Sequence, residues 1–66
     1  MRVIANGDAV ALAEGAHLID LLDVLGVSAK WVVAEVNGEA VERGDMPGLA
    51  LADGDRVELV RAVAGG

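Results

Sequence analysis

Two Asn-Gly pairs set the outline of this chain. Asn6-Gly7 and Asn37-Gly38 each follow a short run of β-prone residues, and each is followed by a second such run. Asn and Gly both tolerate the positive φ angles that a two-residue hairpin turn requires. We therefore expect one β-hairpin at the start of the chain and another past its middle.

A single amphipathic helix is expected between the two hairpins. From residue 18 to residue 25, four leucines recur at i, i+3, i+4 and i+7, the spacing of one helical face. His17 occupies the N-cap position, and Gly26 stands where a left-handed C-cap is expected. A lone His is also a candidate titrating switch or metal ligand. Metal sites need several ligands at fixed spacing, so the capping role is favoured and no metal site is expected.

The other β-prone segments complete a sheet. The expected strands cover residues 2–5, 9–13, 31–36, 39–41 and 56–63, with a loop over 44–50 and a tight turn at 53–55. One helix packed on one face of a mixed sheet of about five strands is an α+β arrangement. The order ββαβββ suits a β-grasp, the ubiquitin-like fold. Sixty-six residues form one such domain, 1–66, and leave no room for a second.

Period-two alternation assigns each strand residue to one face of the sheet. The residues expected to meet the four leucines are Val3, Ala5, Val10, Leu12, Val32, Ala34, Val36, Val57 and Leu59, with Leu51 closing the end of the core. The residues expected on the outer face are Arg2, Ile4, Trp31, Val33, Glu35, Glu58 and Val60. A purely solvated face would be polar at Ile4, Val33 and Val60. We therefore expect these three to form an exposed apolar patch that marks an interaction site.

The composition excludes most catalytic chemistry. There is no cysteine, so disulfides and thiolate chemistry are excluded. The single His and the single Ser show no triad-like spacing, and the acidic residues are scattered along helix face and turns. Eleven acidic against five basic residues give a net charge of −6, which disfavours nucleic acid and anionic membranes as partners and suits a basic protein surface. No signal peptide or membrane-spanning pattern is visible, and a cytoplasmic location is expected.

The C-terminal segment is the most unusual part of the sequence. Ala64-Gly65-Gly66 follows almost directly from the last expected strand. Residues 63–66 are predicted to form a flexible functional tail with a reach of roughly 13 Å. Glycines lack a Cβ and can enter a narrow channel, and the Gly66 carboxylate could attack the α-phosphate of ATP to form an acyl-adenylate. An ordinary frayed terminus is the alternative.

Over its whole length the chain resembles the ubiquitin-like sulfur carriers, and most closely the ThiS family of the thiamine pathway. The resemblance rests on residues 3–7, on the leucines of the expected helix and on residues 34–39. It is strongest over residues 51–66, where an Asp-Gly-Asp turn precedes a strand that leads to diglycine.

The resemblance implies a β-grasp fold and a specific chemistry at Gly66. An E1-like adenylating enzyme would consume ATP to adenylate the Gly66 carboxylate, and sulfur from a cysteine-derived persulfide donor would displace AMP to leave a thiocarboxylate. Thiazole synthase would receive this sulfur. Gly65 and Ala64 would thread the partners' channels, and Ile4, Val33 and Val60 would form the partner-binding face. The chain would then be a protein co-substrate with no bound cofactor, rather than an enzyme.

Three other functions remain open. The small subunit of molybdopterin synthase also ends in diglycine, but its chains are usually longer and carry a proline before the tail, which residues 60–63 lack. Another sulfur carrier, for tRNA thiolation or cysteine synthesis, or a ubiquitin-like modifier is the second alternative. The third is an interaction module with an inert tail. Extra residues after Gly66 should abolish carrier function and leave simple binding intact.

Overall fold

The computed structural model describes residues 1–62, and residues 63–66 lie outside the described part. Its elements in chain order are β1 (Arg2–Ala5), β2 (Asp8–Ala11), α1 (Leu18–Leu25), the 3-10 turn η1 (Ala29–Trp31), β3 (Val32–Val36), β4 (Glu39–Val41), the 3-10 turn η2 (Arg43–Asp45) and β5 (Arg56–Arg61). Within residues 1–62, no helix is long and apolar enough to cross a membrane.

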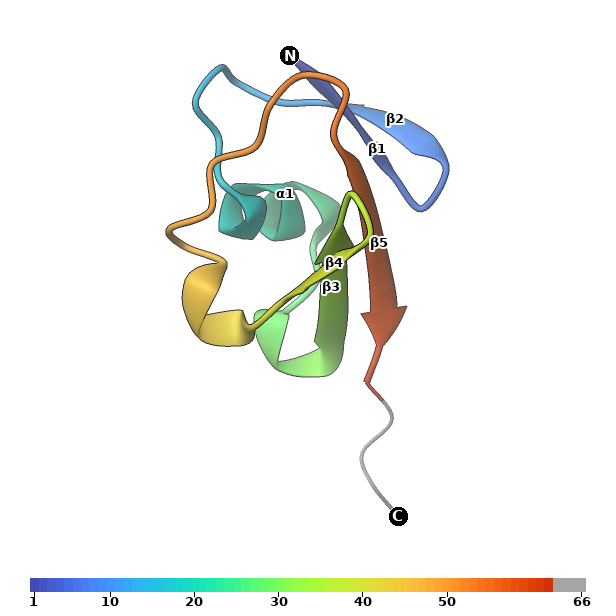
Figure 1. Cartoon of the computed structure of the whole chain (residues 1–66), viewed down its shortest axis with the longest axis vertical. Coiled ribbons are helices and arrows are strands. Elements are labelled where there is room, and N and C mark those ends of the chain that lie inside the picture. Colours follow the sequence, from blue (N-terminus) through green and yellow to red (C-terminus); the bar gives the residue numbers. More distant parts are fainter. Residues whose placement is uncertain (63–66) are drawn as a thin grey trace.

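The five strands form one sheet in the order β2-β1-β5-β3-β4 (Figure 1). Strand β5 lies in the centre, parallel to β1 and antiparallel to β3. The last strand of the sequence therefore joins two hairpins that are each local in sequence. This arrangement confirms the α+β prediction and the mixed five-stranded sheet.

Both Asn-Gly hairpins form as predicted. Asn6 and Asn37 have φ angles of 49° and 51°, and the glycines that follow them have φ angles of 86° and 84°. Positive φ at both central residues is the signature of a type I′ turn, whose twist matches that of the paired strands. The strand residues that flank the turns pair directly, Ala5 with Asp8 and Val36 with Glu39.

Helix α1 packs on one face of the sheet, but only three of its four leucines belong to the core. Leu18, Leu21 and Leu22 are buried, whereas Leu25 is 39% exposed, so its predicted place in the core is wrong. The cause is the end of the helix. Gly26 takes the left-handed conformation, and the Val27 N–H donates to the Leu22 carbonyl at 3.0 Å. This termination turns the chain so that Val27 packs against the core in place of Leu25.

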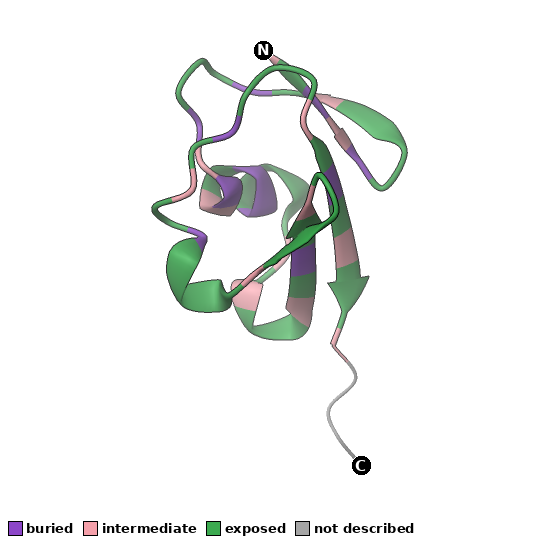
Figure 2. Ribbon diagram, in the orientation of Figure 1, coloured by how far each residue is buried: buried purple, intermediate pink, exposed green. Residues whose placement is uncertain are grey.

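The core lies between α1 and the sheet, and the loop that precedes β5 closes one end of it (Figure 2). Leu51 is buried there as predicted. Met46 is also buried, and sequence patterning missed it because it lies in an irregular segment with no hydrophobic period. Backbone hydrogen bonds hold the loop against the start of the helix, from Leu18 N–H to the Leu49 carbonyl (2.9 Å) and from Leu51 N–H to the Ala16 carbonyl (2.9 Å).

Three predicted strand limits need correction. Strand β2 covers 8–11 rather than 9–13, and β5 ends at Arg61 rather than at residue 63, which lies outside the described residues. Trp31 ends η1 and does not begin β3. The Ser28 hydroxyl accepts a hydrogen bond from the Lys30 N–H at 3.3 Å, which caps this 3-10 turn and delays the start of the strand.

Candidate functional site

The site of interest is the end of β5, because the diglycine segment follows it. On its β1 side, β5 extends beyond the end of the neighbouring strand, because the pairing between the two strands ends at Ala5 and Val57. Beyond this point, the side chain of Asn6 takes over the hydrogen bonding to the β5 backbone. Its Oδ1 accepts from the Leu59 N–H at 2.7 Å, and its Nδ2 donates to the Leu59 carbonyl at 3.1 Å. A turn residue thus braces the part of β5 that β1 does not reach.

The start of β5 is braced in the same manner by the second Asn-Gly turn. The Asn37 Oδ1 accepts from the Arg56 N–H at 2.9 Å, and its Nδ2 donates to an Asp55 carboxylate oxygen at 3.0 Å. The other Asp55 carboxylate oxygen accepts from the Ala52 N–H at 2.8 Å. Asp53 accepts from the Arg2 N–H at 2.7 Å. These bonds give the Asp-Gly-Asp turn a structural role and fix the direction in which β5 runs.

On its other side, β5 pairs with β3 along its full length. The register runs from Val36 opposite Val57 to Val32 opposite Arg61, and the Ala62 N–H extends it by donating to the Trp31 carbonyl at 2.7 Å. The last described residue is therefore tied to the sheet. The predicted tail residues Ala64, Gly65 and Gly66 lie outside the described residues.

Two of the three predicted outer-face residues come together. Val33 and Val60 lie directly opposite each other on β3 and β5, and they are 52% and 63% exposed. Directly opposed side chains of an antiparallel pair have Cβ atoms about 5 Å apart. They form a compact apolar pair near the end of β5 from which the tail follows.

Ile4 does not join this pair, so the single patch predicted for the three residues is wrong. Ile4 is level with Arg56 in the parallel register of β1 and β5, four residues before Val60. With a strand rise of about 3.3 Å per residue, that is roughly 13 Å along the sheet. Ile4 is also only half-exposed.

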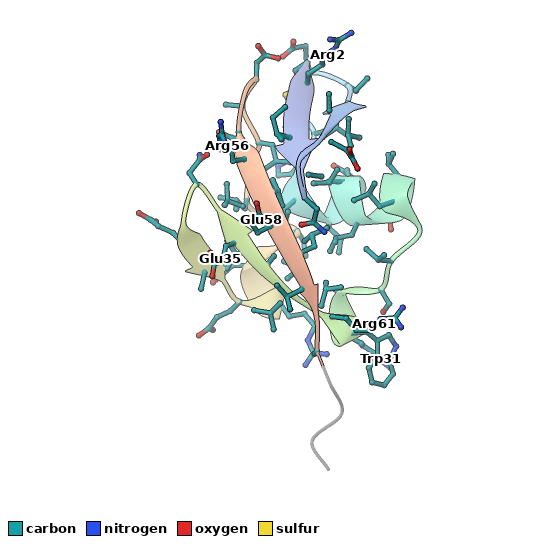
Figure 3. All side chains as sticks on the ribbon, turned by 90° about the vertical axis from the view of Figure 1, so that its right-hand side faces the viewer. Arg2, Trp31, Glu35, Arg56, Glu58 and Arg61 are labelled. Atoms are coloured by element: carbon teal, nitrogen blue, oxygen red, sulfur yellow. The ribbon has the colours of Figure 1, made fainter. Side chains whose placement is uncertain are left out.

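A pair of glutamates lies between Ile4 and the valine pair on the outer face. Glu35 and Glu58 lie directly opposite each other on β3 and β5, and both are exposed on the outer face (Figure 3). Like charges in directly opposed positions destabilise a sheet. Among residues 1–62, neither carboxylate is in an ion pair. The outer face therefore carries an acidic pair, which is in no ion pair among residues 1–62, beside an apolar one.

The described residues offer little chemistry of their own. His17 is the N-cap residue of α1, and its backbone N–H donates to the Asp20 carboxylate at 2.8 Å, which agrees with the structural role predicted for it. Over residues 1–62, no three His, Asp or Glu side chains gather as metal ligands would.

Comparison with known proteins identifies the family to which the chain belongs. The sequence model of the ThiS family matches residues 2–66, which includes both β5 and the diglycine. The chain belongs to the ThiS family. A crystal structure of the thiamine biosynthesis protein ThiS from Geobacter metallireducens superposes with a TM-score of 0.84 at 35% identity, and the match covers 100% of both chains. The solution structure of a thiamine biosynthesis protein from the same organism gives a TM-score of 0.78 at 36% identity over 100% of this chain and 88% of that one. The ThiS fold is a β-grasp, as the sequence predicted.

A curated relative has a different size. This ThiS-family chain is 32% identical over all 66 of its residues to a segment of a thiazole synthase from Paramagnetospirillum magneticum. The match covers 20% of that protein, so the chain spans about a fifth of its length. One protein called a thiazole synthase thus includes a segment equivalent to this domain.

Proposed function

We propose that this chain is a sulfur carrier of thiamine biosynthesis and that Gly66 carries the sulfur. The observation that supports this most strongly is the family match through residue 66, together with full-length likeness to a ThiS structure. The fold adds a physical reason. Hydrogen bonds from both Asn-Gly turns and from β3 hold β5 rigidly, so the residues that follow it start from a fixed point.

The proposed chemistry takes place in partner enzymes. An oxygen of the Gly66 carboxylate attacks the α-phosphate of ATP, and pyrophosphate leaves. The terminal sulfur of a cysteine-derived persulfide then attacks the acyl carbon, and AMP leaves. A second thiol reduces the resulting acyl disulfide, which frees the thiocarboxylate and leaves the donor as a disulfide. In this scheme the chain is a co-substrate and supplies no catalytic group. Ala64 and Gly65 are thin enough to pass through an enclosed channel.

Thiazole synthase is the proposed sulfur acceptor. Support comes from the thiazole synthase that contains a segment equivalent to this domain. Two proteins that work in succession on one bound group gain from being held together, because the second step then occurs at high effective concentration. A separate carrier must achieve the same proximity through its own binding surface.

The outer face is the proposed recognition surface for the partners. Val33 and Val60 supply an exposed apolar pair, and Glu35 and Glu58 supply adjacent negative charge that is in no ion pair among residues 1–62. A partner with an apolar side chain beside an Arg or Lys would cover the valine pair with the first and neutralise the glutamate pair with the second. Ile4 belongs to the same face but contacts a different part of the partner.

The experiment that tests the proposal is intact-protein mass spectrometry. The chain is incubated with an E1-like adenylating enzyme, ATP, a persulfide donor and a thiol. The mass should rise by the difference between sulfur and oxygen, and the change should map to Gly66. Removal of Gly66 withdraws the carboxylate by roughly 3.5 Å, far beyond the tolerance of about 1 Å for attack, so this variant should gain no sulfur. Gly65→Val should also fail, because its branched side chain widens the segment.

Both variants should melt at the temperature of the unmodified chain, since neither change touches the packed domain. Equal thiolation of the chain that lacks Gly66 would rule out the sulfur-carrier function. A chain extended by two residues after Gly66 provides the matched control for length. It should fold normally, bind partners and remain unthiolated.

A further inference from the structure

Primary amines are scarce on this chain. Lys30 is the only lysine, and four arginines supply the other basic side chains. A guanidinium stays protonated and is a poor nucleophile. Lys30 and the α-amine of Met1 are therefore the two groups that could form a stable amide with an activated carboxyl group. This matters because the proposed function activates the carboxylate of Gly66.

The α-amine of Met1 is held within the fold. It donates a hydrogen bond to the Leu12 carbonyl at 2.9 Å and lies 3.5 Å from a Glu14 carboxylate oxygen. The Leu12 N–H donates back to the Met1 carbonyl at 2.8 Å. In Figure 1 the N-terminus lies at the opposite end of the molecule from the end of β5. The α-amine is therefore both engaged and remote from Ala62, the last residue before the tail.

Lys30, by contrast, lies beside the start of the tail. It is exposed in η1, and among residues 1–62 its amine is in no ion pair. The carbonyl of the next residue, Trp31, accepts a hydrogen bond from the Ala62 N–H at 2.7 Å. With standard bond lengths, this contact keeps the Cα atoms of Lys30 and Ala62 within about 10 Å of each other.

The combined reach of the tail and the lysine side chain exceeds this separation. Four residues follow Ala62 and span at most about 14 Å, and an extended lysine side chain adds roughly 6 Å. The tail must therefore turn back toward η1, and the structure leaves room for this turn. A pocket of about 510 Å³, which Trp31 and Arg61 help to line, lies between η1 and the end of β5. The Gly66 carbonyl carbon can thus meet the Lys30 amine without either segment being stretched.

We propose that Lys30 is an acylation site for the chain's own activated C-terminus. This inference rests on the proposed function, because adenylated Gly66 is the acyl donor. The neutral ε-amine attacks the Gly66 carbonyl carbon and forms a carbon–nitrogen bond. The bond from that carbon to the phosphate oxygen breaks, AMP leaves with the electron pair, and the amine releases a proton to water. The product is a ring closed by an amide between Lys30 and Gly66, and it has lost one water relative to the unmodified chain.

Tethering favours this ring over links between two chains. A short stretch of chain gives the groups that it joins an effective concentration on the order of millimolar, roughly a hundredfold above a chain concentration of about 10 μM. Sulfur transfer and ring closure compete for the same carbonyl carbon. Persulfide attack keeps the carrier in use, whereas attack by Lys30 consumes the carboxylate. Ring closure should therefore withdraw adenylated carriers when the sulfur donor is scarce.

The first test supplies an activated Gly66 without any partner enzyme. The full chain is prepared as a C-terminal thioester of a small thiol and followed by intact-protein mass spectrometry. Attack by Lys30 should release the thiol and give a monomer one water lighter than the free acid. Tandem mass spectrometry should locate the new amide between Lys30 and Gly66. Hydrolysis as the only reaction, a covalent dimer as the main product or an amide at Met1 would each overturn the inference.

Two variants test whether the position of the amine matters. Lys30→Arg keeps the positive charge and removes the nucleophile, so its thioester should only hydrolyse. The matched control combines Lys30→Arg with Arg56→Lys, which moves the single lysine to an exposed position at the start of β5. Arg56 is six residues before Ala62, about 20 Å along the strand, which is the limit of the combined reach. Its ring closure should be at least about tenfold slower than that of the unmodified chain. An equal rate would show that any lysine suffices and would overturn the assignment to Lys30.

The second test uses the adenylating enzyme and ATP with no sulfur donor. The ring should accumulate in the unmodified chain and be absent from Lys30→Arg, and a persulfide donor should suppress it in favour of the thiocarboxylate. Thiolation of the unmodified chain without ring formation in either test would overturn the inference and leave the carrier function intact. Ring closure of the thioester in a chain that the enzyme never thiolates would keep Lys30 as the acylation site and remove the carrier function.

Discussion

The side-chain amide of Asn6 makes two hydrogen bonds to the backbone of Leu59, 53 residues away in sequence. It does so from a turn position with φ of 49°. Asn6 therefore has two roles: it adopts the left-handed conformation of the turn, and its side chain pairs with the backbone of β5 where β1 has ended. Asn is suited to both because it tolerates this conformation and offers a donor and an acceptor on one planar group.

Asn6→Gly should separate these two roles. Glycine keeps the turn without strain but removes both hydrogen bonds to Leu59, so the free energy of unfolding should fall by about 1–2 kcal/mol. Urea denaturation followed by circular dichroism measures this change. Asn6→Asp is the companion variant. It retains an acceptor for the Leu59 N–H but sets a carboxylate oxygen against the Leu59 carbonyl, and a stability equal to that of the unmodified chain would contradict the proposed bracing.

Leu22→Ala should destabilise the domain strongly. Leu22 is almost fully buried between α1 and the sheet, and truncation at such a site costs about 2–5 kcal/mol. That is a large share of the 5–15 kcal/mol typical of a folded domain, so partial unfolding at room temperature is expected. Leu25→Ala makes the same chemical change in the same helix at a residue that is 39% exposed, and it should cost less than about 1 kcal/mol. Thermal melting of the two variants side by side checks the helix register.

Val60→Asp should impair partner binding and leave the fold intact. The substitution places a charge in the centre of the exposed apolar pair, where it must be desolvated when a partner covers Val33. A loss of affinity for the adenylating enzyme of at least tenfold is expected by calorimetry, with cooperative melting retained. Val24→Asp is the matched control, since Val24 is equally exposed but lies on α1. Similar losses for both variants would show that added negative charge alone is responsible.

Glu58→Gln should make the free domain more stable and a poorer ligand. Relief of the repulsion between Glu35 and Glu58 should add about 0.2–1 kcal/mol to the free energy of unfolding at low salt. The gain should shrink at 1 M salt, where the screening length falls to about 3 Å. Binding to the adenylating enzyme should weaken at the same time. Unchanged stability at low salt would mean that the two carboxylates do not interact.

Much of the fold could be predicted because its signals are local. The Asn-Gly turns, the leucine spacing of α1 and the Gly26 cap each depend on a few neighbouring residues, and all three appear in the structure. The end of the helix shows the limit of such patterns. Leu25 keeps the spacing of the buried face, but the chain reverses after it and Val27 takes its place.

The features that could not be predicted depend on distant pairings. Ile4 lies far from Val60 because of the parallel register of β1 and β5. This register cannot be deduced from the alternation of apolar residues in either strand alone. The same holds for the Asn6 contact with Leu59. Met46 is buried by a loop that folds over the start of α1, which no periodic pattern indicates. A pocket lined by Val27, Trp31 and Arg61 could not be predicted for the same reason, since its lining comes from separate parts of the chain.

The central place of β5 has a consequence for when the tail becomes usable. The two hairpins can form as soon as they are synthesised, but they do not pair with each other, and only β5 connects them. This strand is also the last of the five to leave the ribosome, and its contacts with β1 close a loop of about fifty residues, a slow event in folding. Until β5 has paired with β1, the domain has no rigid strand end that a partner could bind. A sulfur-loading enzyme that recognises the Ala62 end of the sheet would thereby accept finished domains and pass over incomplete ones.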